Sequence, residues 1–256
     1  MPTAPSRRLP RVHDEPGFIL HRHDWSESSL ILEVLTRQHG RVVLVAKGVK
    51  KPTSQFRPVL LPLQPIRLSW SGDAEVRTLK AAQWQGGHLM PAGDALLAGC
   101  YLNELLLKFL ARDDPHPLLF DHYTQAVRQL ATGATHAAVL RSFELLLLQA
   151  TGFLPSLDQE GSSLQPLDPA AAYQLRPEEG LWLAREATDM ACSGAFWLAL
   201  QVALAAPIPM DALYAAVAED RSGVLRRQLQ ALLHYHSGVR VFQTRQLLAD
   251  MQRLAM

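Results

Sequence analysis

The chain has 256 residues, of which 48% are hydrophobic and 19% charged, and its 25 Lys and Arg almost balance its 24 Asp and Glu. This length suits one large or two ordinary domains, and the apolar content excludes a chain that is disordered throughout. The longest apolar runs, residues 145–148 and 195–200, fall far short of the roughly 18–20 residues of a membrane span, so no membrane partner is expected. The two cysteines, Cys100 and Cys192, cannot build a disulfide framework, which favours a reduced cytoplasmic compartment.

The net charge of +1 conceals a strong asymmetry along the chain. Residues 1–88 contain 13 bases and 7 acids, a balance of +6, whereas residues 89–256 contain 12 bases and 17 acids, a balance of −5. Between Glu33 and Asp73 there are seven bases and no acid. A stretch of one sign raises the local potential and favours a polyanion as ligand. A basic surface that serves only solubility is the alternative.

Residues 1–16 carry Arg7, Arg8 and Arg11 without the apolar core of a secretory signal, and they predict a flexible basic arm. The region that follows is cut by Gly and Pro into short β-branched and apolar runs. Five short strands in about 70 residues fit a five-stranded OB-fold barrel over residues 17–88. The strands are predicted at residues 17–23, 29–36, 41–47, 63–70 and 74–84.

Past Pro91 the apolar period changes to that of helices, which predicts an all-α domain over residues 89–256. An irregular insertion rich in Gly, Ser and Pro is expected at about residues 152–192. The fold class is therefore α+β, with an N-terminal barrel followed by a helical domain. Helices are predicted at residues 92–112, 117–131, 135–151, 194–205, 210–219, 222–236 and 244–254.

Several basic residues cluster around two turns and one strand, where a barrel would present them to DNA phosphates as a single patch. Trp25 and Phe56 sit in polar turns and are candidates for stacking on bases, with the barrel core as the alternative for both. Trp70 lies in an apolar strand, which favours the core. The predicted DNA-binding residues are Arg37, Arg41, Lys47, Lys50, Lys51 and Arg57.

Catalytic signatures are missing from the sequence. There is no Walker loop, no Gly-x-Gly-x-x-Gly, no Gly-x-Ser-x-Gly and no His-Glu-x-x-His. The pairs His21/His23 and His234/His236 each lack a third ligand for zinc, and Cys100 lies in an apolar helix as a small hydrophobe. The sequence therefore predicts a binding protein and not an enzyme, with no catalytic residue, no metal and no cofactor.

Motifs spread over most of the chain resemble the bacterial RecO family of DNA repair and recombination mediators. The resemblance depends on the order of the motifs and is weakest between residues 155 and 200. The motifs are residues 17–22 (GFILHR), 25–30 (WSESSL), 36–41 (TRQHGR), 45–51 (VAKGVKK), 101–105 (YLNEL), 140–146 (LRSFELL), 225–226 (LR) and 243–248 (QTRQLL).

The resemblance implies an N-terminal OB-fold, a helical C-terminal domain and no catalytic turnover. Members of the family bind single- and double-stranded DNA, anneal complementary strands and contact the acidic C-terminal tail of single-stranded DNA-binding protein. With RecR they help RecA to load onto DNA that this protein coats, which implies a cytoplasmic, nucleoid-associated location. Many relatives carry a four-cysteine zinc site after the third helix. Only Cys192 is present in that part of this chain, so the family zinc site is expected to be lost.

The tail of single-stranded DNA-binding protein needs a cation beside an apolar strip. Arg141, Leu145 and Leu148 lie on one face of the predicted third helix at spacings of i, i+4 and i+7, and they are the predicted tail-binding residues. A fully buried helix with Arg141 reaching solvent is the alternative.

Two other functions are compatible with parts of this pattern. Charge and fold alone would allow an OB-fold adaptor that binds RNA or assembles a transcription or translation complex. A nuclease would need clustered carboxylates for metal ions, and residues 34–72 contain none.

Overall fold

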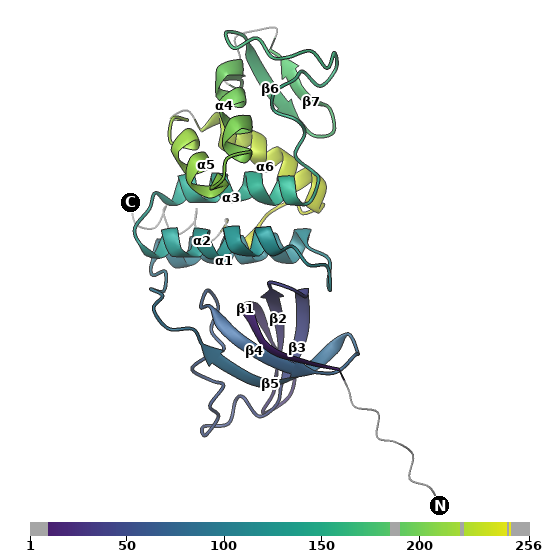
Figure 1. Cartoon of the computed structure of the whole chain (residues 1–256), viewed down its shortest axis with the longest axis vertical. Coiled ribbons are helices and arrows are strands. Elements are labelled where there is room, and N and C mark those ends of the chain that lie inside the picture. The colour runs from purple at the N-terminus through teal and green to yellow at the C-terminus, as the bar shows by residue number, and fades with distance from the viewer. Residues whose placement is uncertain (1–9, 185–189, 221–222, 245, 247–256) are drawn as a thin grey trace, which may run out of the picture. The chain divides into compact units, whose positions relative to one another are not determined.

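The computed structural model describes residues 10–184, 190–220, 223–244 and 246, and the chain divides into two compact units (Figure 1). The first comprises residues 1–90 together with 110–120, and the second comprises residues 91–109 and 121–256. The first unit is built on a β-barrel and the second is mainly helical. The predicted architecture of a barrel followed by a helical domain is therefore confirmed.

Five strands close the barrel in the order β1-β2-β3-β5-β4. β3 and β5 are parallel, and every other neighbouring pair is antiparallel. β1 serves two neighbours, because residues 17–24 pair with β2 while residues 11–17 pair with β4. This is the predicted five-stranded OB-type barrel. The strands are β1 (Arg11–Asp24), β2 (Leu30–Thr36), β3 (Gly40–Ala46), β4 (Ile66–Ser71) and β5 (Val76–Trp84).

Inward-facing side chains from all five strands fill the barrel. On β3 these are Val42, Leu44 and Ala46, which alternate with outward-facing residues as a strand requires. Trp70 is only 2% exposed and belongs to this core, as its apolar strand predicts.

The predicted flexible arm over residues 1–16 is too long. Residues 11–16 form the first part of β1, where Arg11 pairs with Ser71 and Pro16 with Arg67. The local sequence hides this strand, because it contains Pro16 and because Asp14 adopts a left-handed φ of 54° at an irregularity in the pairing with β4. The remainder of the predicted arm, residues 1–9, lies outside the described residues.

A segment distant in sequence completes the barrel unit, and we call residues 110–120 the return segment. Its residue Arg112 pairs with Arg41 of β3, and the pairing of β3 with β5 begins two residues later, at Val43. The amide of Asp113 donates to the carbonyl of Arg41 at 2.9 Å. Gly40 has a φ of 67°, and a Cβ there would lie 2.1 Å from the carbonyl oxygen of Asp114. Only glycine therefore fits where the return segment crosses the start of β3.

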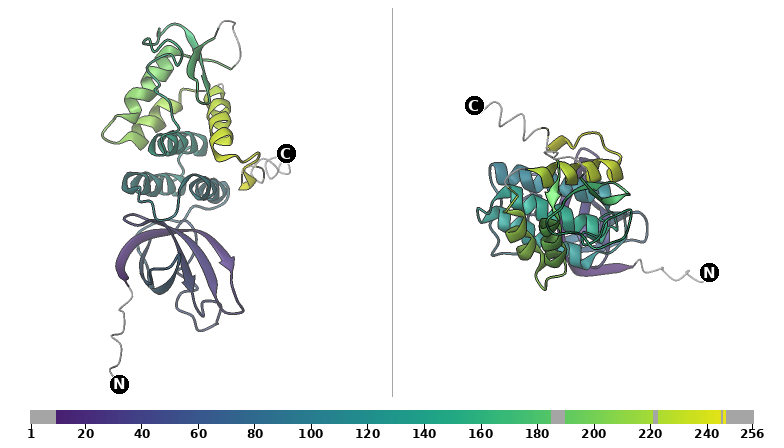
Figure 2. Two further views of the ribbon diagram at one scale, coloured as in Figure 1. Left: turned by 90° about the vertical axis from the view of Figure 1, so that its right-hand side faces the viewer. Right: turned by 90° about the horizontal axis from the view of Figure 1, so that it is seen from above.

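The second unit contains the helices of the described chain, and α1 and α2 lie side by side with α3 in the next layer (Figure 2). α3 is buried on nearly all sides, as its continuous apolar run predicts. Of the helix predicted at 244–254, most lies outside the described residues. The helices are α1 (Asp94–Phe109), α2 (Pro117–Ala131), α3 (His136–Ala150), α4 (Gly194–Leu204), α5 (Pro209–Val217) and α6 (Val224–Ser237). Among the helices that the structure describes, none is long and apolar enough to cross a membrane.

The segment predicted as irregular at about residues 152–192 contains a small antiparallel sheet. Its strands are β6 (Ala172–Arg176), β7 (Gly180–Leu183) and β8 (Cys192–Ser193), in the order β7-β6-β8. These strands have at most five residues, which is too short for a clear period-two pattern. One face of this sheet is buried, and it carries the side chains of Tyr173, Leu175 and Leu181.

Candidate nucleic-acid interface

Two loops meet at one end of the barrel. Leu30, the first residue of β2, pairs with both Asp24 at the end of β1 and Ala46 at the end of β3. Residues 25–29 and the segment that follows β3 therefore leave the barrel at the same end. Lys50 joins them, because its amide donates to the carbonyl of Ser28 at 3.0 Å and its Nζ donates to the carbonyl of Ser26 at 3.1 Å. We call residues 25–29 together with 47–57 the basic end.

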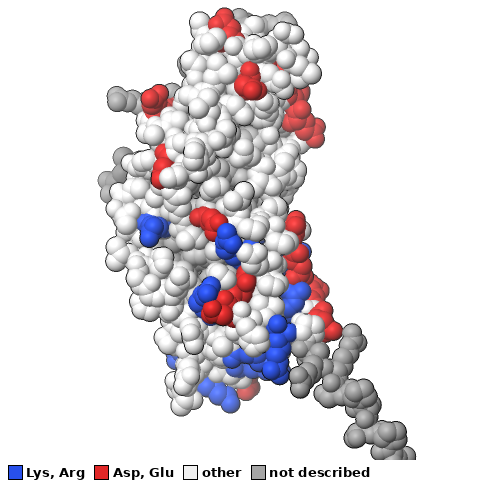
Figure 3. Space-filling view, in the orientation of Figure 1, with Lys and Arg blue, Asp and Glu red and all other residues white. Residues whose placement is uncertain are grey.

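The cations of the basic end differ in how accessible they are. Lys47, Lys51 and Arg57 are exposed. Lys50 is half-buried, and its Nζ lies 2.6 Å from a carboxylate oxygen of Asp24. Lys50 therefore serves mainly to hold the two loops together, and the three exposed cations supply the accessible charge. On the face drawn in Figure 3, Lys and Arg gather over the barrel, whereas Asp and Glu prevail on the helical unit.

The two predicted stacking residues have different environments. Trp25 is 66% exposed in the loop between β1 and β2, beside the backbone that Lys50 holds. Phe56 is partly buried and packs against the barrel core, so its position is better explained by packing. An exposed indole next to cations is the arrangement that proteins use to stack unpaired bases while holding the phosphates.

Replacing Trp25 by alanine is expected to weaken single-stranded DNA binding by about tenfold, because one stacked base contributes about 1–3 kcal/mol. The midpoint of thermal unfolding should not change, since the indole is largely in solvent. Fluorescence anisotropy with a labelled oligothymidine measures the affinity. The matched control is Trp84→Ala, since Trp84 is 53% exposed and pairs with Ile66 at the other end of the barrel. Equal losses in both variants would contradict a stacking role for Trp25.

Arg37 and Arg41 do not belong to the basic end. Thr36 pairs with Gly40, so the turn that carries Arg37 lies at the opposite end of β2 and β3. Arg37 is half-buried there. Along β3 the distance from Arg41 to Lys47 is roughly 20 Å, at about 3.3 Å per residue. The prediction of one continuous patch is therefore wrong, because the strand separates its members.

Arg41 is also neutralised within the barrel unit. Its guanidinium donates to the carboxylate of Glu33 at 2.9 Å and to the carbonyl of Leu110 at 3.1 Å. The other carboxylate oxygen of Glu33 accepts from Arg112 at 2.6 Å. Hydrogen bonding to Glu33 raises the pKa of Arg112 above its ordinary value. Arg41 is thus placed in an ion-paired group and not at a free phosphate-binding surface.

Two further ion pairs extend this group. Arg112 also pairs with Glu75, and Arg77 pairs with Asp113 at 2.6 Å. Three arginines therefore face three carboxylates, although the sequence between Glu33 and Asp73 contains no acid. Sequence reasoning did not single out Arg77 or Arg112, because Arg112 meets Glu33 across 79 residues and no local pattern signals that contact.

The predicted tail-binding residues on α3 are not at a surface. Leu145 and Leu148 have no exposed area, and Arg141 is 7% exposed. Arg141 pairs with Glu144, which also accepts a hydrogen bond from the hydroxyl of Tyr101 at 2.8 Å. The prediction of an accessible pocket at these three residues is therefore wrong for this structure, since α3 is enclosed by its neighbours and Arg141 is ion-paired with Glu144.

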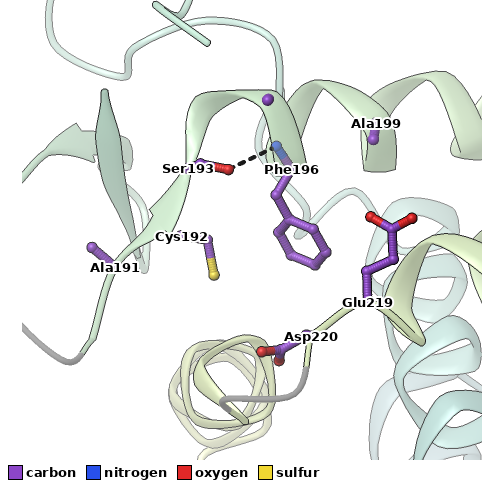
Figure 4. Close-up of a pocket in the computed structure, with 8 residues that line it drawn as sticks. Ala191, Cys192, Ser193, Phe196, Ala199, Glu219 and Asp220 are labelled. Carbon is purple, nitrogen blue, oxygen red and sulfur yellow. Dashed lines mark hydrogen bonds between the residues drawn. The ribbon is translucent and has the colours of Figure 1, made fainter. Parts of the chain in front are cut away.

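A pocket of about 550 Å³ in the helical unit lies between β8, α4 and the end of α5. Figure 4 shows the ring of Phe196 directed between the thiol of Cys192 and the carboxylates of Glu219 and Asp220. Burial, and next the charge of Asp220, raise the pKa of Cys192 to about 12, so its thiol stays protonated and is a poor nucleophile. The carboxylate of Asp220 accepts from the amides of Gly223 and Leu225 at the start of α6. These contacts indicate a structural role for Asp220.

The other cysteine, Cys100, is partly buried. Burial raises the pKa of Cys100 as well. Within the described part of the chain, no group of three or more His, Cys, Asp or Glu is arranged to hold a metal ion.

The fold and the basic end define a class, that of proteins with an OB-type nucleic-acid-binding module joined to a helical domain. The family model described as "Recombination protein O N terminal" matches residues 11–87, and the one described as "Recombination protein O C terminal" matches residues 90–201. The chain belongs to the RecO family. It therefore has a role in DNA repair and recombination, in a family that is not known for enzymes.

Curated relatives cover nearly the whole chain. A protein of Albidiferax ferrireducens named "DNA repair protein RecO" is 55% identical over 248 residues, which are 96% of this chain and 98% of the relative. Proteins with the same name from Polaromonas naphthalenivorans and Variovorax paradoxus are 57% and 56% identical, each over 95% of this chain and 98% of the relative.

Proposed function

We propose that the chain binds single- and double-stranded DNA through the basic end of its barrel. The observation that carries this proposal is the exposed indole of Trp25 in one loop of the basic end, whose other segment carries the exposed cations Lys47, Lys51 and Arg57. Each phosphate contact on a single strand adds about 0.7 to the slope of log affinity against log salt, so three contacts correspond to a slope of about −2. Duplex DNA offers the same phosphates without unpaired bases to stack on, which favours single strands.

We further propose the complete mediator role for this chain. In that role it anneals complementary strands, acts with RecR, and helps RecA to load onto DNA coated by single-stranded DNA-binding protein, in the cytoplasm and at the nucleoid. Family membership supports this proposal. The tail of single-stranded DNA-binding protein would have to bind outside the face of Arg141, because that face is buried.

Strand annealing tests the proposal against an RNA-binding adaptor. Two complementary DNA strands with a fluorophore and a quencher are coated with single-stranded DNA-binding protein and mixed with the chain. We expect annealing to accelerate at least about tenfold over the coated strands alone, because a phosphate-binding surface offsets the repulsion between strands. Tight binding of RNA without acceleration of DNA annealing would contradict the mediator role and favour the adaptor.

A further inference from the structure

A second group of arginines lies at the start of β3, away from the basic end. Arg41, Arg77 and Arg112 come together there from β3, β5 and the return segment. Their carboxylate partners are Glu33, Glu75 and Asp113, so the group as a whole carries no net charge. Its guanidinium groups are the donors that best match the geometry of a phosphate.

The acids that close this group are held weakly. The carboxylates of Glu75 and Asp113 are largely exposed, and their side chains retain 68% and 45% of their accessible area. Ion pairs between exposed side chains contribute little to stability and are screened by salt. A competing anion therefore has little to overcome at these two pairs.

The ends of the return segment are buried, whereas the residues in its middle are exposed although they pair with β3. Leu110, Leu119 and Phe120 are buried, and the ring of Phe120 lies 5.6 Å from that of Phe18. Residues 111–115 are all exposed. The side chains of this middle part can therefore change partners, although its backbone is tied to β3 by the hydrogen bond from the amide of Asp113 to the carbonyl of Arg41.

We propose that Arg77 and Arg112 form a second phosphate-binding site beside Arg41, which Glu75 and Asp113 close in this structure and which DNA opens. The proposal rests on the proposed function, because a strand held at the basic end is the source of the phosphates. Arg41 lies roughly 20 Å from Lys47 along β3, a distance that a single strand of several nucleotides spans. The phosphates replace the two exposed carboxylates on Arg77 and Arg112, while Glu33 remains with Arg41.

Two substitutions that are closely matched separate this proposal from a general charge effect. Asp113→Asn removes the acid that pairs with Arg77, and Asp14→Asn removes the acid that pairs with Arg67 elsewhere on the barrel. Both aspartates are exposed, both have a left-handed φ, and each lies within 2.7 Å of its arginine. Asn tolerates that backbone conformation, so neither substitution strains the fold.

The affinity of each variant is measured with a labelled oligothymidine of about 30 nucleotides, longer than the 4–16 nucleotides that one OB-fold covers. We expect Asp113→Asn to raise the affinity about fourfold and to steepen the salt slope by about 0.7, the value of one added phosphate contact. Asp14→Asn should change neither. Adding Arg77→Gln to Asp113→Asn should return both quantities to those of the unsubstituted chain.

Equal gains in affinity for Asp113→Asn and Asp14→Asn would overturn the second site and leave DNA binding at the basic end intact. Failure of the unsubstituted chain to bind the oligonucleotide would overturn the proposed function and this inference with it. Hydrogen exchange gives an independent readout, because the amide of Asp113 is protected by the carbonyl of Arg41. Saturating DNA should accelerate exchange at Asp113, and unchanged protection would overturn the opening.

Discussion

Simultaneous replacement of Lys47, Lys50 and Lys51 by alanine is expected to lower the affinity for single-stranded DNA by about 100-fold at physiological salt. Two of these residues are exposed cations, and Lys50 holds the loop that carries Trp25 against the segment after β3. The variant therefore loses phosphate contacts and the position of the indole together. The salt slope should become shallower by about 1.4 for the two exposed lysines, at about 0.7 for each contact on a single strand. A gel-shift or anisotropy titration at several salt concentrations measures both effects.

The control for this variant removes the same charge elsewhere. Lys80 on β5, Lys108 on α1 and Arg128 on α2 are all exposed, and none of them belongs to the basic end. Their joint replacement by alanine should lower the affinity less than about threefold, since distant exposed charges are screened by salt. Comparable losses in the two variants would mean that net charge alone governs binding.

Replacing Arg141 by methionine is expected to destabilise the helical unit by about 3 kcal/mol, because it removes a cation that pairs with the buried carboxylate of Glu144. Glu144 has no exposed area, and it also accepts a hydrogen bond from the hydroxyl of Tyr101. Urea unfolding followed by circular dichroism at the helical band measures the effect. The exposed Arg128 on α2 provides the comparison, and Arg128→Met should change the free energy of unfolding by less than about 0.5 kcal/mol.

The same pair of variants tests how α3 relates to the tail of single-stranded DNA-binding protein. If Arg141→Met left the stability unchanged and removed binding of the tail peptide, Arg141 would be a surface residue after all. Because Arg141 is buried, we expect Arg141→Met to lower the stability of the helical unit. Any loss of peptide binding should follow from that loss of stability.

Local patterns in the sequence were sufficient for the barrel and for most of its strands. β2 and β3 are short, mostly apolar runs rich in β-branched residues and bounded by turn residues, and such patterns act over neighbouring positions. The first part of β1 was missed because its pairing with β4 spans about 50 residues and its own sequence contains Pro16. The burial of α3 follows from its apolar residues, and the ion pair between Arg141 and Glu144 is local at i, i+3. The hydrogen bond from Tyr101 on α1 to Glu144 spans 43 residues and has no local signal.

The candidate site was only partly predictable, and the reason is electrostatic. Lys47 and Lys51 are exposed, as the sequence suggests. Arg41 lies in the same run of bases, yet folding brings Glu33 from β2 and the return segment from residues 110–120 to it. A count of charges along a sequence cannot include acids that arrive from distant positions.

Hydrogen exchange on the full chain, with and without single-stranded DNA, shows whether DNA contacts the basic end. We expect DNA to protect residues 25–29 and 47–57 and to leave exchange in the turn at residues 37–39 unchanged. Protection confined to the helical unit, with the basic end exchanging at the same rate in the presence and absence of DNA, would contradict DNA binding at the basic end.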